Sequence, residues 1–399
     1  MLRLLVSAGD PSGDLIASHL VREIKKQRPD VEIWALGGPE LAATSDVFLE
    51  DLASRGLMGW LEPIRKLPFL ANLNRRLRDI LKRHAFDMVI PVDFYGFNIR
   101  LAAQAKKLGY PVVYYVSPQL WASRPGRIKR MKRLVDHVLC VFPFEPDFYK
   151  KHGLPATFVG HPIVELLSLE FRDVHAENVA VNGHRPASMS DRPRIGLLPG
   201  SRPGEIARHM DVLLKSWRLI CEEFPQARGI LYKRLGQERL YPSDGDLAAM
   251  GVAAEWGPAY QSRHACDLAL CASGLASLEN MVLGVPMVIY YGVRPAWLFH
   301  IVKRIVKTPF IGMPNILAGS EICRELPWAM NPENDARAAR DMSAAAIELL
   351  KAPERLAALR GNLSGLADSL LPQGQSPRRA AQEAVFRLLG AKISGTQTV

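Results

Sequence analysis

Short apolar runs alternate with amphipathic stretches along this chain, and the whole pattern occurs twice. Apolar runs bounded by turn residues are typical of strands buried on both faces of a parallel sheet, and the stretches between them have helical spacing. The expected strands are Leu2–Ser7, Val31–Leu36, Met88–Val92, Val112–Val116, His137–Val141, Thr157–Val159, Ile195–Leu198, Gly229–Tyr232, Leu268–Cys271 and Met287–Tyr291. The pattern predicts an α/β protein with two Rossmann-like domains that face a central cleft, where ligands bind at the carboxyl ends of the strands.

A polar stretch without clear periodicity separates the two halves, and 399 residues suit two domains of ordinary size. The resulting division is an N-terminal domain over 1–165, a connection over 166–193, a C-terminal domain over 194–375 and a helical tail over 376–399. For the tail, packing back on the N-terminal domain is one option.

The chain is basic, with 51 Lys and Arg against 40 Asp and Glu and a net charge of +11. Residues 1–165 hold 24 basic and 17 acidic side chains, with clusters at Arg65–Arg83 and Arg124–Arg133. Such an excess favours an anionic partner: nucleic acid, an anionic membrane surface or a phosphorylated substrate. A solvated helix face explains either cluster alone equally well. Apart from Phe69 the clusters lack interleaved aromatic residues, which argues against nucleic acid.

Cysteine usage and the N-terminus predict a cytoplasmic protein. The five cysteines have no CxxC spacing, and the histidines lack metal-ligand spacing, so we expect reduced thiols and no metal. We find neither a signal peptide at the start nor an apolar run long enough to span a membrane.

Two glycine-containing loops follow expected strands and open helices. In SAGDPSGD, Gly9 and Gly13 permit a tight turn, and the free N–H groups at the helix start attract an anion; the alternative is an ordinary turn capped by Ser12 or Asp14. In LLPGSRPGEI, the turn at Gly200 and Ser201 stands beside the charged fork of Arg202. The second loop predicts a diphosphate site, with an ordinary strand-to-helix loop as the alternative, and the lack of a Walker lysine argues against a P-loop nucleotidase.

A third strand-to-helix loop, CASGLASLEN, presents Ser273 and Gly274 at a helix start. Glu279, one turn later, is able to accept two sugar hydroxyls, although N-capping and an exposed glutamate explain the motif as well.

Asp93 ends an apolar strand in PVDFYGFN, so we expect a carboxylate with a raised pKa that faces the cleft as a general base. The alternative is an aspartate that caps the following helix.

The stretch GLMGWLEPIRKLPFL combines apolar residues with cations. It predicts either a membrane or acyl-chain contact or a core helix followed by a basic one. The candidate contact residues are Met58, Trp60, Leu61, Ile64 and Phe69.

Together these motifs resemble the bacterial lipid-A-disaccharide synthases, glycosyltransferases of the two-Rossmann GT-B type. The resemblance runs from Leu2 to at least Arg324 and also includes the segments MGWLEPI, YYVSPQLWASRPGRIKRM, FPFEPDFY, FVGHP and VKRIVKTPFIGMPNILAG.

The resemblance implies transfer of 2,3-diacylglucosamine from UDP to the 6-hydroxyl of 2,3-diacylglucosamine 1-phosphate, with inversion and without a metal. It implies that Asp93 is the base and that Gly9, Asp10, Ser12 and Gly13 line the acceptor side of the cleft. The implied donor-binding residues are Gly200, Ser201, Arg202, Glu205, Ser273, Gly274, Glu279 and Asn315. It further implies a UDP-sugar donor, a phosphorylated glycolipid acceptor, no cofactor and peripheral contact with the inner face of the cytoplasmic membrane. The sequence decides neither for nor against a homodimer.

The chain departs from the family pattern at four positions: Asp10 replaces Glu, Gly96 replaces a second Asp, Leu275 replaces Thr and Trp328 replaces Gln. Because Leu275 and Trp328 are expected beside the donor, a second hypothesis stays open. It is another GT-B enzyme that uses a UDP-sugar, either a diverged glycosyltransferase or a UDP-N-acetylhexosamine epimerase.

Overall fold

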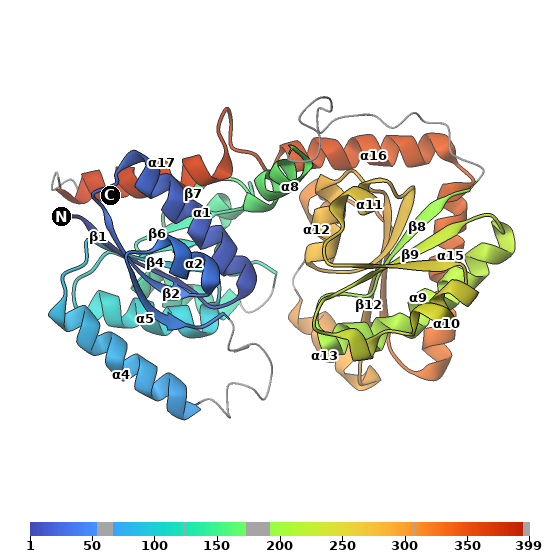
Figure 1. Ribbon diagram of the computed structural model, residues 1–399, viewed down its shortest axis with the longest axis horizontal. Helices are drawn as coiled ribbons and strands as arrows, with labels where there is room; N and C mark the ends of the chain where they lie inside the picture. The colour runs from blue at the N-terminus through green and yellow to red at the C-terminus, as the bar shows by residue number, and fades with distance from the viewer. Residues whose placement is uncertain (54–66, 123–124, 173–191, 307, 394–399) are drawn as a thin grey trace. The chain divides into compact units, whose positions relative to one another are not determined.

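The computed structural model describes residues 1–53, 67–122, 125–172, 192–306 and 308–393 (Figure 1). The chain divides into two compact units, which are described separately below. Unit 1 comprises Met1–Pro162 and the chain from Leu370 onward, and unit 2 comprises Ile163–Ser369.

Unit 1 is built on a parallel seven-stranded sheet with the order β3-β2-β1-β4-β5-β6-β7. Its strands are β1 (Arg3–Ala8), β2 (Glu32–Gly37), β3 (Val47–Asp51), β4 (Met88–Val92), β5 (Val113–Tyr115), β6 (His137–Cys140) and β7 (Ala156–Phe158). Because β2 and β3 lie on one side of β1 while β4 lies on the other, the strand order reverses between β1 and β4. In open α/β sheets such a reversal leaves a crevice at the carboxyl ends of the two strands.

Helices cover both faces of this sheet, and Figure 1 shows α1 with α17 on one side and α4 with α5 on the other. The helices of unit 1 are α1 (Pro11–Gln27), α2 (Pro39–Thr44), α4 (Leu67–Arg83), α5 (Tyr95–Lys107), α6 (Ile128–Leu134), α7 (Glu145–Lys151) and α17 (Pro377–Ile393), with a short 3₁₀ turn at Pro125–Arg127. The C-terminal helix α17 packs on α1, where Arg378 pairs with Glu23 at 3.3 Å and Gln382 hydrogen-bonds Gln27.

Unit 2 repeats the design with a parallel six-stranded sheet in the order β10-β9-β8-β11-β12-β13. Its strands are β8 (Arg194–Leu198), β9 (Arg228–Lys233), β10 (Val252–Trp256), β11 (Leu268–Ala272), β12 (Met287–Val293) and β13 (Glu325–Ala329). The order reverses between β8 and β11, so the carboxyl ends of these strands form the equivalent position.

The helices of unit 2 are α9 (Pro203–Glu223), α10 (Asp244–Ala249), α11 (Tyr260–His264), α12 (Leu275–Val282), α13 (Ala296–Ile305), α14 (Met313–Ala318), α15 (Pro332–Leu350) and α16 (Pro353–Asp368), with a 3₁₀ turn at Glu238–Leu240. Helix α8 (Pro162–Arg172) begins at the boundary between the units, and the predicted connection over 166–193 therefore starts inside a helix.

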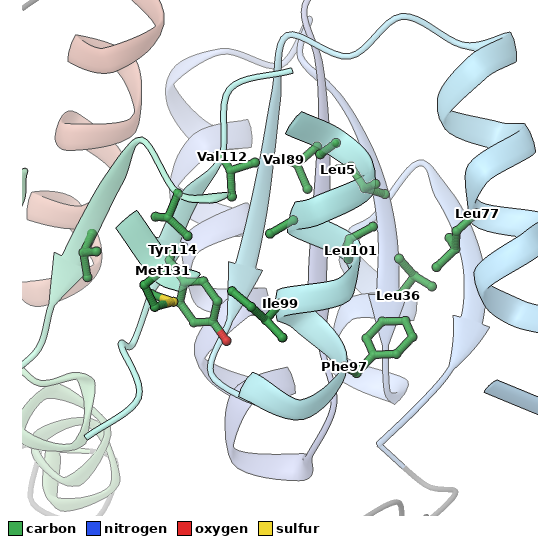
Figure 2. Packing of buried hydrophobic residues seen from close by; sticks show 14 of the residues in the cluster. Leu5, Leu36, Leu77, Val89, Phe97, Ile99, Leu101, Val112, Tyr114 and Met131 are labelled. Carbon is green, nitrogen blue, oxygen red and sulfur yellow. The ribbon is translucent and has the colours of Figure 1, made fainter. Parts of the chain in front are cut away.

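Each unit has its own hydrophobic core. In unit 1, side chains from β1, β2, β4 and β5 meet α4, α5 and α6, and Figure 2 shows Leu5, Val89, Leu101 and Tyr114 among them. In unit 2, α9 and α15 pack together, and Trp217 of α9 is almost completely buried. These cores fix the two sheets on which the loops described below are carried.

The structure confirms every strand expected from the sequence and adds β3, β10 and β13. It also corrects one helix start. Helix α1 begins at Pro11 with Asp10 as its N-cap, and neither Ser12 nor Asp14, the caps considered from the sequence, has that position. The proline at the first helical position suits this start because its missing N–H has no partner there in any case.

Candidate functional site

The loops singled out by the sequence lie where the strand order of each sheet reverses. In unit 1 the Gly9–Gly13 loop follows β1 and Asp93 follows β4, while in unit 2 the Gly200–Glu205 loop follows β8 and Ser273 follows β11. Each unit therefore brings two of the predicted loops together at one position of its sheet.

Asp93 connects β4 to α5 in a strained conformation. Its φ is +46° and that of Phe94 is +44°, a left-handed region that few non-glycine residues adopt. Helix α5 begins at Tyr95, and no side chain caps it. Asp93 is thus not a helix cap, and strain of this kind gathers at functional positions.

The carboxyl group of Asp93 has an unusual environment. Burial raises its pKa and the neighbouring Asp10 carboxylate raises it further, whereas the N–H of Phe94 acts in the opposite direction; the pKa is about 6. The rise agrees with the sequence prediction. A carboxylate with such a pKa is ionised near neutral pH and is a stronger base than an ordinary aspartate.

The Gly9–Gly13 loop touches the turn that carries Asp93. A Cβ atom on Gly9 would overlap the Phe94 ring, so only glycine fits there. Asp10 accepts a hydrogen bond from the N–H of Gly13 at 2.6 Å and is almost fully buried, while Ser12 is exposed. The loop therefore places a second carboxylate beside the first.

Asp14, in the same motif, has a structural task that the sequence did not reveal. Its buried carboxylate accepts hydrogen bonds from the N–H groups of Gly38, Glu40 and Leu41, at 2.7–3.1 Å. It fixes the start of α2 rather than contributing to a ligand site.

In unit 2 the β8–α9 loop wraps around the side chain of Glu205. One carboxylate oxygen accepts the N–H groups of Ser201 and Arg202 at 3.1 and 3.3 Å, and the other accepts the Arg202 guanidinium at 3.1 Å. Gly200 has φ +121°, and a Cβ there would come within 2.8 Å of the Cβ of Glu205. The groups predicted to hold a diphosphate thus form a capping box with a carboxylate of the chain itself.

His209 of α9 contacts this loop and the strand β12. Its Nδ1 lies 2.9 Å from the carbonyl oxygen of Pro199 and its Nε2 lies 3.2 Å from the N–H of Gly292, so Nδ1 donates and Nε2 accepts. Burial lowers the pKa of His209, in keeping with a neutral ring that ties the β8–α9 loop to β12. No sequence motif marks this histidine, because its partners lie up to 83 residues away along the chain.

The β11–α12 loop is held by a neighbouring loop. The Ser273 hydroxyl donates to the carbonyl oxygen of Ile311 at 2.9 Å, and Gly274, with φ +137°, opens α12 with free space where a Cβ would stand. Leu275, which departs from the family pattern, is exposed at the first position of the helix.

Glu279 lies one turn into α12 and is paired. Its two oxygens accept hydrogen bonds from the buried guanidinium of Arg263 at 2.7 Å and from the hydroxyl of Tyr260 at 3.1 Å. Arg263 also donates to the Asn280 side chain, at 2.6 and 3.2 Å. These contacts orient the carboxylate, whose oxygens each retain a lone pair for a further donor. The sequence analysis identified neither Arg263 nor Tyr260.

The structure does not support Asn315 as a direct donor contact. Its side chain is completely buried; Nδ2 donates to Cys323 and Glu325, and Oδ1 accepts from Ile322 and Cys323, at 2.7–2.9 Å. Glu325 in turn accepts the N–H groups of Ile311 and Gly312. Asn315 therefore fixes the loop that holds Ser273, and its hydrogen-bonding groups are already engaged.

Of the predicted membrane or acyl-chain residues, Met58, Trp60, Leu61 and Ile64 lie outside the described residues. Phe69 lies near the start of the basic helix α4 and is partly buried against the core of unit 1, which both alternatives allow. Of the other two departures from the family pattern, Gly96 is exposed in the first turn of α5, and the Arg337 guanidinium lies over the Trp328 ring, 5.6 Å from its centroid.

A separate hollow in unit 2, of about 540 Å³, lies at the amino ends of β8, β9 and β10, with Arg194, Arg228 and Glu255 in its lining. Because the predicted site residues lie at the carboxyl ends of the strands, this hollow is not part of the candidate site.

Two further observations concern the described residues as a set. None of the helices among them is long and apolar enough to cross a membrane. No group of three or more His, Cys, Asp or Glu side chains within the described ranges is placed to hold a metal ion.

Comparison with known proteins identifies relatives over most of the chain. The family model described as lipid-A-disaccharide synthetase matches residues 4–349. The lipid-A-disaccharide synthase of Methylobacillus flagellatus is 35% identical over 328 residues, which is 80% of this chain and 84% of the relative. That of Geobacter metallireducens is 34% identical over 394 residues, 98% of both chains.

Solved structures share the fold. The UDP-GlcNAc 2-epimerase from Neisseria meningitidis bound to UDP-GlcNAc matches with a TM-score of 0.59 at 12% identity, covering 97% of this chain and 99% of the epimerase. Acinetobacter baumannii MurG matches with a TM-score of 0.54 at 15% identity, covering 98% and 99%. At these identities the likeness concerns the fold alone, and it agrees with the GT-B type predicted from the sequence.

Proposed function

Because the chain belongs to the lipid-A-disaccharide synthetase family of glycosyltransferases, we propose that it joins two acylated glucosamine units with inversion. The donor is UDP-2,3-diacylglucosamine, and the acceptor is 2,3-diacylglucosamine 1-phosphate. The products are the lipid A disaccharide 1-phosphate and UDP.

The observation that carries this proposal is the partly buried carboxyl group of Asp93, which has a pKa of about 6 and extends from a strained backbone. In the proposed step it removes the proton of the acceptor 6-hydroxyl while that oxygen forms a bond to the anomeric carbon of the donor. The bond from this carbon to the diphosphate breaks, and its electron pair leaves with UDP. A single general base is what an inverting transfer needs on the acceptor side.

The leaving diphosphate needs positive charge, which unit 2 can supply without a metal ion. The β8–α9 loop offers the Arg202 guanidinium and the N–H groups of Ser201 and Arg202, and the N-terminus of α12 follows Gly274. Helix N-termini attract anions because their N–H groups are unpaired and the helix dipole is positive there. In this proposal the diphosphate replaces the Glu205 carboxylate at Arg202.

The donor sugar has a candidate partner in Glu279. Arg263 and Tyr260 hold its carboxylate in place, and its remaining lone pairs accept sugar hydroxyls. This role and the position of the diphosphate are parts of one proposal about unit 2.

The acceptor carries a phosphate and acyl chains, and the basic side chains of unit 1 suit it. Helices α4 and α6 contain most of the two basic clusters, and the net charge of the chain is +11. Such helices attract an anionic membrane surface, with about 1 kcal/mol per Lys or Arg near that surface. We therefore propose peripheral contact with the cytoplasmic membrane through unit 1.

The test is turnover by purified protein. With both lipid substrates in mixed micelles and with EDTA present, the enzyme should release one UDP per disaccharide formed. Asp93→Asn should abolish most turnover while UDP affinity stays within about twofold, because UDP is proposed to bind to unit 2.

Absence of turnover across a series of acyl-chain lengths would contradict the proposal. Consumption of UDP-GlcNAc without lipid would instead favour the second hypothesis, a UDP-sugar epimerase or diverged transferase.

A further inference from the structure

The backbone carbonyl oxygen of Asp93 accepts hydrogen bonds from two buried side chains that belong to other parts of unit 1. The hydroxyl of Tyr114, on β5, donates to this oxygen, and so does the Nδ2 of Asn98, on α5, at 2.9 Å. Tyr114 and Asn98 are both completely buried. Figure 2 shows the Tyr114 ring in the same cluster as Ile99 and Met131.

Asn98 links three segments at this point. Its Nδ2 lies within hydrogen-bond distance of the carbonyl oxygens of Ser7, Val92 and Asp93, at 2.9–3.2 Å, and its Oδ1 accepts the Ser7 hydroxyl at 2.8 Å. The side chain thus connects the end of β1, the end of β4 and the strained turn. A buried amide with all these partners has a fixed orientation.

The turn needs such support because its backbone is unfavourable. Two consecutive non-glycine residues, Asp93 and Phe94, have positive φ angles, and conformations of this kind persist only where the surroundings over-determine them. The Phe94 ring is confined on one side by Gly9. Tyr114 and Asn98 hold the adjoining carbonyl, so the direction in which the Asp93 side chain leaves the backbone is fixed.

We propose that Tyr114 and Asn98 are positioning residues that aim the Asp93 carboxylate at the acceptor hydroxyl. This inference rests on the proposed role of Asp93 as the general base. It adds a specific claim: hydrogen bonds to a backbone carbonyl, which touch neither substrate, contribute to turnover but not to binding. Small misplacements of a reacting group are costly because proximity and orientation account for a large part of enzymatic rate enhancement.

The decisive variant is Tyr114→Phe, which removes one hydroxyl and keeps the ring. A matched control is Tyr149→Phe, in the same unit. Tyr149 is also completely buried, and its hydroxyl donates to a different backbone carbonyl, that of Pro118, at 3.1 Å. Both variants lose one buried hydrogen bond, so a general effect on stability appears in both.

We expect Tyr114→Phe to lower kcat by about tenfold while KM for both substrates and the Kd for UDP stay within about twofold. Tyr149→Phe should leave kcat within about twofold of the unmodified enzyme, with a similar fall in thermal midpoint. A second variant, Ser7→Ala, removes the bond that orients Asn98 and should lower kcat by a smaller factor with the same unchanged KM.

A kcat for Tyr114→Phe equal to that of Tyr149→Phe would overturn the inference, as would losses of kcat that merely follow the losses of stability. If Asp93→Asn is inactive but Tyr114→Phe is fully active, the positioning role of Tyr114 is refuted, while the role of Asp93 as base stands. If Asp93→Asn keeps most of its kcat, the role of Asp93 as base fails, and the positioning role fails with it.

Discussion

Replacing Asp93 by Asn should make the protein more stable at neutral pH, even though the change is expected to remove its activity. Folding raises the pKa of this carboxyl group from 3.8 to about 6, chiefly through burial. The ionised side chain is therefore less favourable in the folded protein than in the unfolded chain. Asn has no charge to bury, keeps nearly the same shape and is one of the residues that tolerate a positive φ.

The magnitude follows from the proton linkage. With pKa values of 3.8 in the unfolded chain and about 6 in the folded protein, the folded state binds more protons, so stability falls as pH rises through this interval. The penalty is about 1.5 kcal/mol near pH 5 and about 3 kcal/mol near pH 8, where it levels off. Removing it should raise the thermal midpoint of a unit of this size by at most about 6–12 °C near pH 8, and by about half of that near pH 5.

The measurement is the difference in thermal midpoint between Asp93→Asn and the unmodified protein across this pH range. Asp30→Asn serves as the control. Asp30 lies between α1 and the amino end of β2, whereas Asp93 follows the carboxyl end of β4. The hydrogen bond that Asp30 accepts from Arg28 lowers its pKa to about 2. The control removes the same charge and should give no gain in stability at any pH.

The reasoning is refuted if Asp93→Asn and the unmodified protein have the same thermal midpoint, or if the difference between their midpoints does not grow with pH. An equal gain in Asp30→Asn would refute it as well, because the effect would then reflect net charge rather than the surroundings of Asp93.

Three further substitutions test the two loops. Asp10→Asn keeps a good N-cap but removes one negative charge beside Asp93, so the acid limb of the kcat/KM–pH profile should move to lower pH. Because burial is the larger cause of the raised pKa of Asp93, the move should be less than about one pH unit, and an unmoved limb contradicts the prediction. Glu205→Gln removes a negative charge from the proposed diphosphate position, so calorimetry should show UDP binding that is severalfold tighter. Weaker UDP binding would show that the Glu205 carboxylate is needed to shape the loop. Gly9→Ala places a methyl group against the Phe94 ring and should cost about 1–3 kcal/mol in urea unfolding together with most of kcat; unchanged stability would mean that the ring moves freely.

The central strands were predictable from sequence because they are buried on both faces and read as continuous apolar runs. Strands β4 and β11, for example, are buried at every position. The three strands that the sequence analysis missed, β3, β10 and β13, are edge strands with mostly partial burial and mixed composition. An edge strand packs one side against its neighbour and exposes the other, so an apolar run marks it less clearly. The remaining edge strand of the two sheets, β7, was nevertheless expected from Thr157–Val159.

Sequence motifs located the loops of the candidate site but not the side chains that hold them. Asp93 and Arg202 stand in loops with recognisable turn chemistry directly after strands, and Glu279 lies one turn into the helix that follows such a loop. Their supports come from distant positions: Ser7 and Asn98 are 91 residues apart, and Arg263 precedes Glu279 by 16. No local pattern links such pairs, because the fold alone brings them together.

The positive φ angles at the proposed sites of the two units fall on different residue types. In unit 2, the positive φ angles of the β8–α9 and β11–α12 loops fall on Gly200 and Gly274. Glycine adopts positive φ angles without strain. It also keeps the backbone N–H groups, which are the main groups that these loops offer to an anion. In unit 1 the positive φ angle falls on Asp93, which glycine cannot replace if the carboxylate itself is needed. The chain therefore keeps an unfavourable backbone at the one position where a side chain is proposed to react, and it surrounds that position with Asn98 and Tyr114. Val116 in unit 1 and Ala259 in unit 2 also have positive φ angles without a proposed reaction, so the backbone angle of Asp93 supports its proposed role only together with the buried side chains that hold its turn.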